Sequence, residues 1–260
     1  MARFLRRNSL LIAGLLAALA VAAAAWALVR PEVEKPRLGL LTTLPIYWSE
    51  SADISEMLAR DGEPPRARQA LERDYRLVPL DTLDPRKSEQ GDPQPTLGDL
   101  DYLLLAQPRA LQGLENVALD EWVREGGRVL VFADPMLTGH SRFHIGDRRR
   151  PQDVVLLSPI LRRWGLDLRF DDEQAEGERM SEFDGAALPL NLAGHFETIP
   201  TAPDAPSQCK LFADGAATEC TIGQGTALVV ADAALFEEEM ASDERQATLA
   251  MLAERAFGGR

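Results

Sequence analysis

Two short apolar runs, separated by a helix-like segment, constrain the fold of this chain more than any other stretch. Residues 102–106 and 129–133 have the length and composition of strands buried on both faces, as in a parallel sheet. Between them, apolar side chains recur on one helical stripe, at Leu114, Ala118 and Trp122. Gly126 and Gly127 then supply a helix stop, because glycine adopts the left-handed backbone conformation at little cost. The pattern predicts a βαβ unit with a right-handed crossover.

The same kinds of segment recur along the chain. Further strands are expected at 37–43, 75–80, 166–170 and 226–231, and helices at 66–74, 154–164 and 242–257. This alternation predicts an α/β fold with a mostly parallel, flavodoxin-like sheet and flanking helices. Residues 171–222 are acidic and contain scattered prolines and turn signals, which predicts a small β insertion instead of another βαβ unit.

The N-terminal region predicts a membrane anchor. Residues 10–29 form an unbroken run of 20 uncharged, mainly apolar residues after an arginine-containing segment, 1–9. As a helix with ~1.5 Å per residue, the run would span about 30 Å, the thickness of a hydrocarbon core. The arginines predict a cytoplasmic N-terminus, a tether at 30–36 and a periplasmic domain at 37–260, held by a single span in a bacterial inner membrane. The alternative is a cleaved signal peptide with A-x-A-like sites at 22–25, although such peptides usually have an apolar run of only about 7–15 residues.

The charge of the chain excludes one class of partner. The net charge is −13, and it becomes −16 beyond residue 29, because Arg3, Arg6 and Arg7 are the only charged residues before that point. So acidic a domain repels phosphate backbones, which argues against nucleic-acid binding. It also argues against flat adsorption on an anionic leaflet.

The two cysteines are expected to pair. An Asp-Gly step at 214–215 is a preferred two-residue hairpin connection, and it would place Cys209 opposite Cys220. In an exported protein, two cysteines that face each other across a hairpin predict a disulfide. Counted from that turn, they occupy a hydrogen-bonded pair, where Cα atoms lie about 5.5 Å apart.

Polar residues follow the expected strands at the edge where open α/β sheets usually bind ligands. The candidate binding residues are Thr43, Tyr47, Trp48, Gln107, Arg109, Asp134 and Asp232, with Arg148, Arg149 and Arg150 at the rim. The aromatic pair could line a crevice or cover the sheet end as core. The three consecutive arginines could contact an acidic partner or neutralise neighbouring acids. Both aspartates could instead cap the turns that follow them.

The order of several motifs resembles the glutamine-amidotransferase-like domain of the ABC-type gliding-motility auxiliary proteins. These motifs are Gln107-Pro108 after a strand, Trp122-Val123 before Gly126-Gly127 in a helix, Asp134-Pro135 after the next strand, and the stretches 158–172 and 223–237. The resemblance covers most of the chain from residue 37 onward. It implies a class I amidotransferase-like sheet. It also implies a role as an auxiliary or binding component of an ABC-type transport or cell-envelope system, with a permease or envelope protein as partner.

The resemblance also shows where a nucleophile would lie. In working class I amidotransferases, a cysteine follows the strand equivalent to 129–133, and the next backbone N–H helps to hold the oxyanion. Here that turn reads Asp134-Pro135, and proline has no N–H. The stretch 232–239, where the family's histidine and glutamate would follow, contains no histidine. The sequence therefore predicts a protein without catalysis, cofactor or metal, and no P-loop or G-x-G-x-x-G motif follows any expected strand.

Two other functions stay open. His140 and His144 would share one face of a helix and, with Asp147 or Asp153, could hold a metal. Ser141 between them could be a nucleophile, so the chain could be a hydrolase or a metal-dependent enzyme. The third possibility is a structural envelope protein without a ligand.

Overall fold

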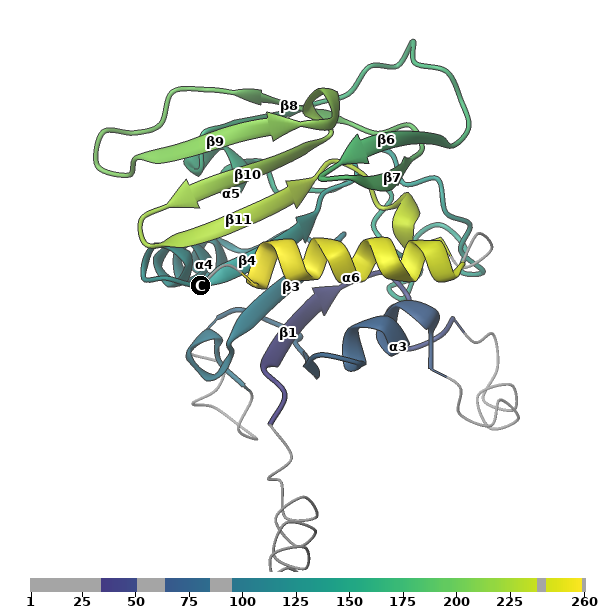
Figure 1. Ribbon diagram of the computed structural model, residues 1–260, viewed down its shortest axis with the longest axis horizontal. Coiled ribbons are helices and arrows are strands. Elements are labelled where there is room, and N and C mark those ends of the chain that lie inside the picture. The colour runs from purple at the N-terminus through teal and green to yellow at the C-terminus, as the bar shows by residue number, and fades with distance from the viewer. Residues whose placement is uncertain (1–33, 51–63, 85–94, 238–241, 259–260) are drawn as a thin grey trace, which may run out of the picture. The chain divides into compact units, whose positions relative to one another are not determined.

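The computed structural model describes residues 34–50, 64–84, 95–237 and 242–258 (Figure 1). Pro36–Arg260 forms one compact unit, separate from Met1–Lys35, and it is this unit whose fold follows. The predicted anchor at 10–29 lies outside the described residues. Among the residues that are described, no helix has the length and apolar character needed to cross a membrane.

A seven-stranded sheet with the order β2-β1-β3-β4-β11-β10-β9 forms the centre of the domain. Its parallel part consists of β1 (Arg37–Thr42), β2 (Arg76–Pro79), β3 (Tyr102–Ala106), β4 (Arg128–Phe132) and β11 (Gly225–Val230). Two antiparallel strands, β10 (Ala217–Ile222) and β9 (Ser207–Phe212), complete it. The five parallel strands follow the flavodoxin-like order 2-1-3-4-5, which confirms the predicted mostly parallel α/β sheet.

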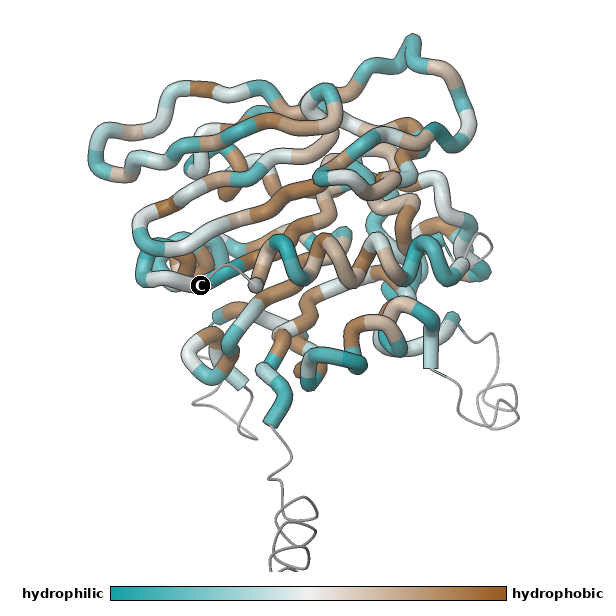
Figure 2. The backbone as a smooth tube through the Cα atoms, in the orientation of Figure 1, coloured by the Kyte–Doolittle hydropathy of each residue, from teal (hydrophilic) through white to brown (hydrophobic). Residues whose placement is uncertain are grey.

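The central strands are buried on both faces because helices cover each side. Side chains alternate across a strand, so Leu104 and Leu130 enter one core while Leu103 and Val129 enter the other. The first core packs against α3 (Arg66–Glu72) and α6 (Asp243–Phe257), and the second against α4 (Gly113–Arg124) and α5 (Ser158–Arg163). In Figure 1, α6 crosses in front of the sheet and α4 and α5 lie behind it. Figure 2 shows the central strands mainly brown, whereas teal and brown alternate along α6.

The helix ends follow from local capping. The Ser242 side chain accepts a hydrogen bond from the Arg245 backbone N–H and starts α6, where the sequence predicts a start. The helix expected at 154–164 is shorter, because α5 begins only at Ser158, with proline in its first turn. Gly165, with φ +84°, ends it. The described residues also contain three short 3-10 segments: η2 (Leu97–Asp99), η3 (Ala213–Gly215) and η4 (Ala234–Phe236).

The strands of the predicted β-rich region at 171–222 take part in three separate hairpins or strand pairs. Its first strands, β6 (Arg179–Phe183) and β7 (Ala186–Leu190), form a separate hairpin, and β8 (His195–Thr198) pairs with β5 (Leu166–Arg169). The expected strand at 166–170 therefore lies outside the central sheet. The last hairpin, β9 and β10, extends the central sheet because β10 pairs antiparallel with β11.

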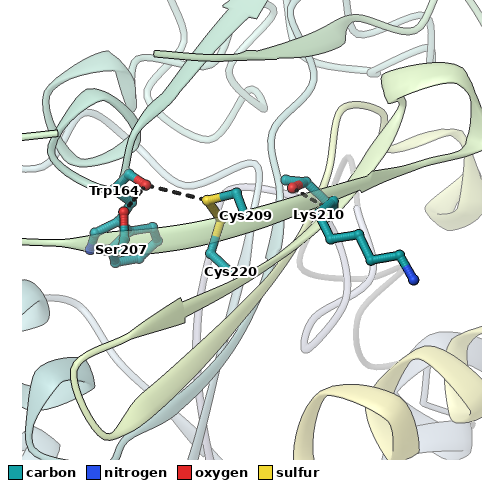
Figure 3. Close-up of a disulfide and its surroundings, with 6 residues drawn as sticks. Trp164, Ser207, Cys209, Lys210 and Cys220 are labelled. Atoms are coloured by element: carbon teal, nitrogen blue, oxygen red, sulfur yellow. Dashed lines mark hydrogen bonds between the residues drawn. A yellow bond between two sulfur atoms is a disulfide. The ribbon is translucent and has the colours of Figure 1, made fainter. Parts of the chain in front are cut away.

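The predicted disulfide joins Cys209 of β9 to Cys220 of β10 (Figure 3). The predicted register is confirmed, but the turn is longer than two residues: Phe212 pairs with Ala217, and both Ala213 and Asp214 have positive φ. The cysteine Cα atoms lie 4.0 Å apart, close to the spacing of a non-hydrogen-bonded pair, so the expected hydrogen-bonded position was wrong. The longer turn moves the alternation of paired positions by one step.

Candidate functional site

The side chain of Gln107 connects the end of β3 to the end of β4 through hydrogen bonds. Its Nε2 donates to the carbonyl oxygens of Asp134 (3.0 Å) and Gln152 (2.9 Å), and its Oε1 accepts from the Asp134 backbone N–H (2.9 Å). Gln107 is fully buried and has φ +43°. A non-glycine residue keeps this unfavourable backbone conformation only where surrounding contacts hold it in place, as these hydrogen bonds do. This predicted binding residue therefore uses its amide inside the protein.

Thr43 connects the end of β1 to the same network. Its hydroxyl donates to the Gln107 carbonyl oxygen (2.6 Å) and accepts from the Gln152 backbone N–H (3.0 Å). Two residues predicted to bind a ligand thus hold together the ends of three neighbouring strands and the long loop after β4.

Asp134 and Asp232 come together at the ends of β4 and β11, and we call them the strand-end carboxyl pair. The Asp134 carboxylate accepts from the backbone N–H groups of Met136 (2.8 Å) and Ala233 (3.0 Å), so it links two strand ends. The Asp232 carboxylate accepts from the backbone N–H groups of Ala234 (2.5 Å) and Asn191 (2.7 Å). Asn191 follows β7, so the pair ties three chain segments to one another.

Burial controls the protonation of this pair. It raises the pKa of Asp134 to about 6, and the nearby Glu237 acts in the same direction, while the N–H groups of Met136 and Ala233 oppose the rise. Burial also raises the pKa of Asp232 well above its usual value, and the charge of Asp134 adds to this effect. Two adjacent carboxyl groups of this kind titrate as a unit.

A cavity of about 480 Å³ lies at the carboxyl ends of the parallel strands. Residues that follow β1, β4 and β11 line it, together with Glu178 and Asn191 from the β6–β7 region. Both Asn191 and Ala233 line the cavity and donate their N–H groups to the strand-end carboxyl pair. The pair therefore lies directly behind one wall of the cavity.

Three glutamates line this cavity, and each has a partner. Glu237 accepts from the Thr138 hydroxyl (2.6 Å). Glu50 accepts from the Ser141 hydroxyl and the Arg142 backbone N–H, both at 2.8 Å. Glu178 pairs with Arg245, which also donates to the Ala234 carbonyl oxygen. The carboxylates are thus oriented before any ligand enters.

The predicted aromatic pair lies on the segment that borders the cavity. Tyr47 packs partly against the core, with the Arg68 guanidinium 4.1 Å from its ring centroid. Trp48 contacts Tyr47 edge-on, at 4.9 Å between centroids, and is 69% exposed. Tyr47 therefore fits the core interpretation of this pair, whereas Trp48 is open to a partner.

Arg109 lies in the loop between β3 and α4, at the same edge of the sheet. Its two terminal nitrogens donate to both oxygens of Glu115 (2.6 and 2.8 Å), and one also donates to the Asp81 carbonyl oxygen (2.7 Å). Burial would raise the pKa of Glu115, but hydrogen bonds from Arg109, Thr82 and two backbone N–H groups outweigh it and lower the pKa to about 2. Arg109 thus serves an internal ion pair.

Two of the three consecutive arginines pair with neighbouring acids. Arg149 contacts Asp147 at 2.8 Å, and Arg150 contacts Asp153 at 2.9 Å. Arg148 is exposed. These contacts favour local neutralisation for Arg149 and Arg150 and leave Arg148 at the surface.

The segment that contains the two loop histidines is not helical, so the expectation that His140 and His144 share a helix face was wrong. His140 and Ser141 line the cavity, and both histidines are exposed. Within the described ranges, no group of three or more His, Cys, Asp or Glu side chains could hold a metal ion.

Several residues of the cavity were not predicted. Glu237 belongs to a motif that the sequence already singled out, and Glu50 lies two residues after the aromatic pair. Glu178 and Asn191 come from the β-rich region, and no local pattern indicates that this region reaches the sheet edge. Only the path of the chain between β5 and β8 brings them to the cavity.

The fold and the site define this protein as an α/β domain with a central, mostly parallel sheet and a cavity at the carboxyl ends of its parallel strands. Residues 66–252 match a family described as a domain of unknown function, DUF4350, and the chain belongs to that family. The match identifies neither the gliding-motility auxiliary proteins nor the amidotransferases. No curated protein matches the sequence.

Several solved structures are similar at low identity. An exo-beta-1,4-mannosidase from an Opitutaceae bacterium has 13% identity, covers 90% of this chain and 37% of its own, and gives a TM-score of 0.48. The GH42 beta-galactosidase Gan42B has 13% identity, 87% and 30% coverage, and a TM-score of 0.47. The mmIFT52 N-terminal domain has 11% identity, 85% and 97% coverage, and a TM-score of 0.47. The chain thus spans about a third of the first two proteins.

Proposed function

We propose that this chain is a non-enzymatic binding domain, tethered to the periplasmic side of a bacterial inner membrane, that serves an ABC-type transport or cell-envelope system. The apolar run at 10–29 and its flanking arginines support the tether. The order of motifs at the strand ends supports the ABC-type setting, through its resemblance to the gliding-motility auxiliary domains.

One observation carries the non-enzymatic part of the proposal. The corner where a class I amidotransferase would hold its cysteine reads Asp134-Pro135, and the Asp134 side chain is fully buried. Both oxygens of that carboxylate accept backbone N–H groups, from Met136 and Ala233. The group is thus committed to holding the chain and has no free face toward the cavity.

The neighbouring cavity is suited to recognition. Its volume of about 480 Å³ is that of a small-molecule or side-chain pocket, and it combines apolar walls such as Leu44 and Phe236 with oriented polar groups. Trp48 beside it offers an exposed aromatic surface, the kind of side chain enriched at binding hot spots.

A photo-crosslinking experiment tests the proposal in cells that express the full chain. A benzophenone amino acid replaces Trp48 next to the cavity, or Leu114 on the exposed side of α4 as a matched control at an apolar, partly exposed position. We expect the Trp48 position to give a discrete crosslink to an ABC-type membrane component and the Leu114 position to give none. Identical products from both positions, or none from either, would contradict the proposed role.

The hydrolase alternative rests on one contact. The Ser141 hydroxyl donates to the Glu50 carboxylate at 2.8 Å inside the cavity, so an acceptor for its proton is in place. We expect Ser141→Ala and Glu50→Gln to leave any hydrolysis of p-nitrophenyl esters at the wild-type level. A loss of tenfold or more in both variants, on the order expected for general-base catalysis, would replace the binding proposal with a hydrolase.

A further inference from the structure

The strand-end carboxyl pair holds together several chain segments that form the cavity wall. Asp134 links the loop after β4 to Ala233, in the segment that follows β11. Asp232 links Ala234 of the same segment to Asn191 at the end of β7. Two of the four donors, Ala233 and Asn191, belong to residues that line the cavity. Any change in the charge of the pair therefore acts on that wall.

In the part of the chain that the structure describes, no cation compensates the negative charge of the pair. Glu237 follows β11 and adds a further negative charge near both aspartates. From α6, the guanidinium of Arg245 approaches the Ala234 carbonyl oxygen, but it forms its ion pair with Glu178. The contacts of the two aspartates themselves are backbone N–H groups, which carry only partial positive charge.

We propose that Asp134 and Asp232 share protons as a pair and control the cavity wall. When the pair is protonated, at mildly acidic pH, the wall stays closed, and when the pair ionises, near neutral pH, the wall opens more often. The inference concerns regulation of the cavity that the proposed function uses. The titration of the pair itself does not require that any ligand binds there.

The direction follows from linkage. When the wall is closed, Asp134 is buried and its pKa is about 6, whereas an opened wall exposes the carboxyl to water and restores a pKa near its usual value. The closed state therefore binds the proton more tightly, and ionisation favours opening. From pH 5 to pH 7.5, this difference predicts an increase of about tenfold in the opening equilibrium.

Amide hydrogen exchange measures this opening. After correction for the intrinsic chemical rate, we expect the amides of Met136 and Ala233 to be about tenfold less protected at pH 7.5 than at pH 5. The amides of Leu83 and Gln112 serve as an internal control, because they donate to Glu115, whose pKa is about 2. Their protection should stay constant over the same range.

Two matched variants separate the pair from the rest of the loop. Asp134→Asn removes the charge of one member of the pair, and its single amide oxygen can accept from only one of the two N–H groups of Met136 and Ala233. The readout is therefore the pH dependence of Ala233 protection, which should fall well below the wild-type value while Asp232 keeps its own contribution. Asp147→Asn changes an aspartate of the same loop that pairs with Arg149, and it should leave the pH dependence intact. A pH dependence that is undiminished in Asp134→Asn, or that disappears in Asp147→Asn, would overturn the proposal.

A direct titration keeps the proposal testable if Asp134→Asn fails to fold. Carbon-13 NMR of the side-chain carboxyl groups in the wild-type chain should show both aspartates of the pair still titrating above pH 5, while Glu115 shows no change. Complete ionisation of both aspartates below about pH 4.5, as for exposed carboxyls, would refute a shared proton. A failed crosslink from Trp48 would affect the proposed function but would leave this result unchanged.

Discussion

Two buried carboxyl sites at the same edge of the sheet have opposite protonation behaviour. Glu115, in the first turn of α4, contacts the guanidinium of Arg109, and its pKa is lowered to about 2. Among the described residues, Asp134, next to the cavity, has only backbone N–H donors and the acidic neighbour Glu237 acting on it, and its pKa is raised to about 6. Burial is the largest influence on both and raises the pKa in each case. At these two sites, the donors in contact with the carboxylate decide its charge: Glu115 has a cation and a hydroxyl in addition to two backbone N–H groups, whereas Asp134 has two backbone N–H groups.

The largest expected effect concerns the pH dependence of stability. A group with a raised folded-state pKa contributes stability that is fully present below its unfolded pKa of about 3.9 and is lost as pH rises through about 6. For Asp134 the loss is on the order of 3 kcal/mol. Asp134→Asn should therefore reduce the fall in unfolding free energy between pH 4 and pH 7, as measured by urea denaturation, while buried Asp232 retains its own part of that fall. A fall as large in the variant as in the wild type would contradict the raised pKa of Asp134.

The second effect tests the ion pair at Glu115, where the pKa is lowered. Arg109→Met removes the only cation in contact with buried Glu115 among the described residues, so the unfolding free energy at pH 7 should fall by about 2 kcal/mol. This is below the usual cost of breaking a buried pair, because the Arg109 side chain is itself 34% exposed. Arg162→Met, at a more exposed ion pair with Asp167, should change stability by less than about 0.5 kcal/mol. Equal losses in the two variants would remove the distinction between the sites.

Arg109→Met should also change the pH at which Glu115 is protonated. In the wild type, the lowered pKa contributes stability that is present above the ordinary glutamate range and is lost only as pH falls toward about 2. Without Arg109, protonation should begin nearer the ordinary pKa, and acid unfolding should start at a higher pH. Circular dichroism as a function of pH between 2 and 5 would measure this shift.

The smallest effect refines the cavity side of the comparison. Glu237→Gln removes a negative charge whose effect on the pKa of Asp134 is smaller than those of burial and of the two backbone N–H groups, so that pKa should fall only slightly. Carboxyl carbon-13 titration of the variant would measure the change. A fall all the way to the ordinary range would mean that Glu237, and not burial, controls the site.

The local pattern of the sequence predicted the framework well. The strand expected at 102–106 is β3 itself, and the one at 129–133 differs from β4 by a single residue at each end. Both are determined by side chains that must be apolar on two faces, which is visible in any short window. The register of Cys209 with Cys220 was also predictable, because a hairpin relates residues that are close in sequence.

The roles of the site residues were not predictable in the same way. Thr43, Gln107 and Arg109 have the chemistry of binding residues, yet each uses its polar atoms on the protein itself. Which use prevails depends on whether a buried carbonyl, N–H or carboxylate lies within reach. That information belongs to the neighbouring strand and not to the residue's own segment.

By itself, the sequence determined the buried strands, the helices between them, the cysteine pair and the polar character of the strand ends, because each depends on periodicity or on contacts between residues near in sequence. Tertiary structure alone decided that Asp134 meets Asp232, that Arg109 reaches Glu115 and that Asn191 enters the cavity wall. The order of strands in the sheet brings residues such as Asp134 and Ala233 together across 99 positions, and no local pattern encodes that order. The charge of a buried carboxyl depends on those distant neighbours, so it is a property of the folded chain.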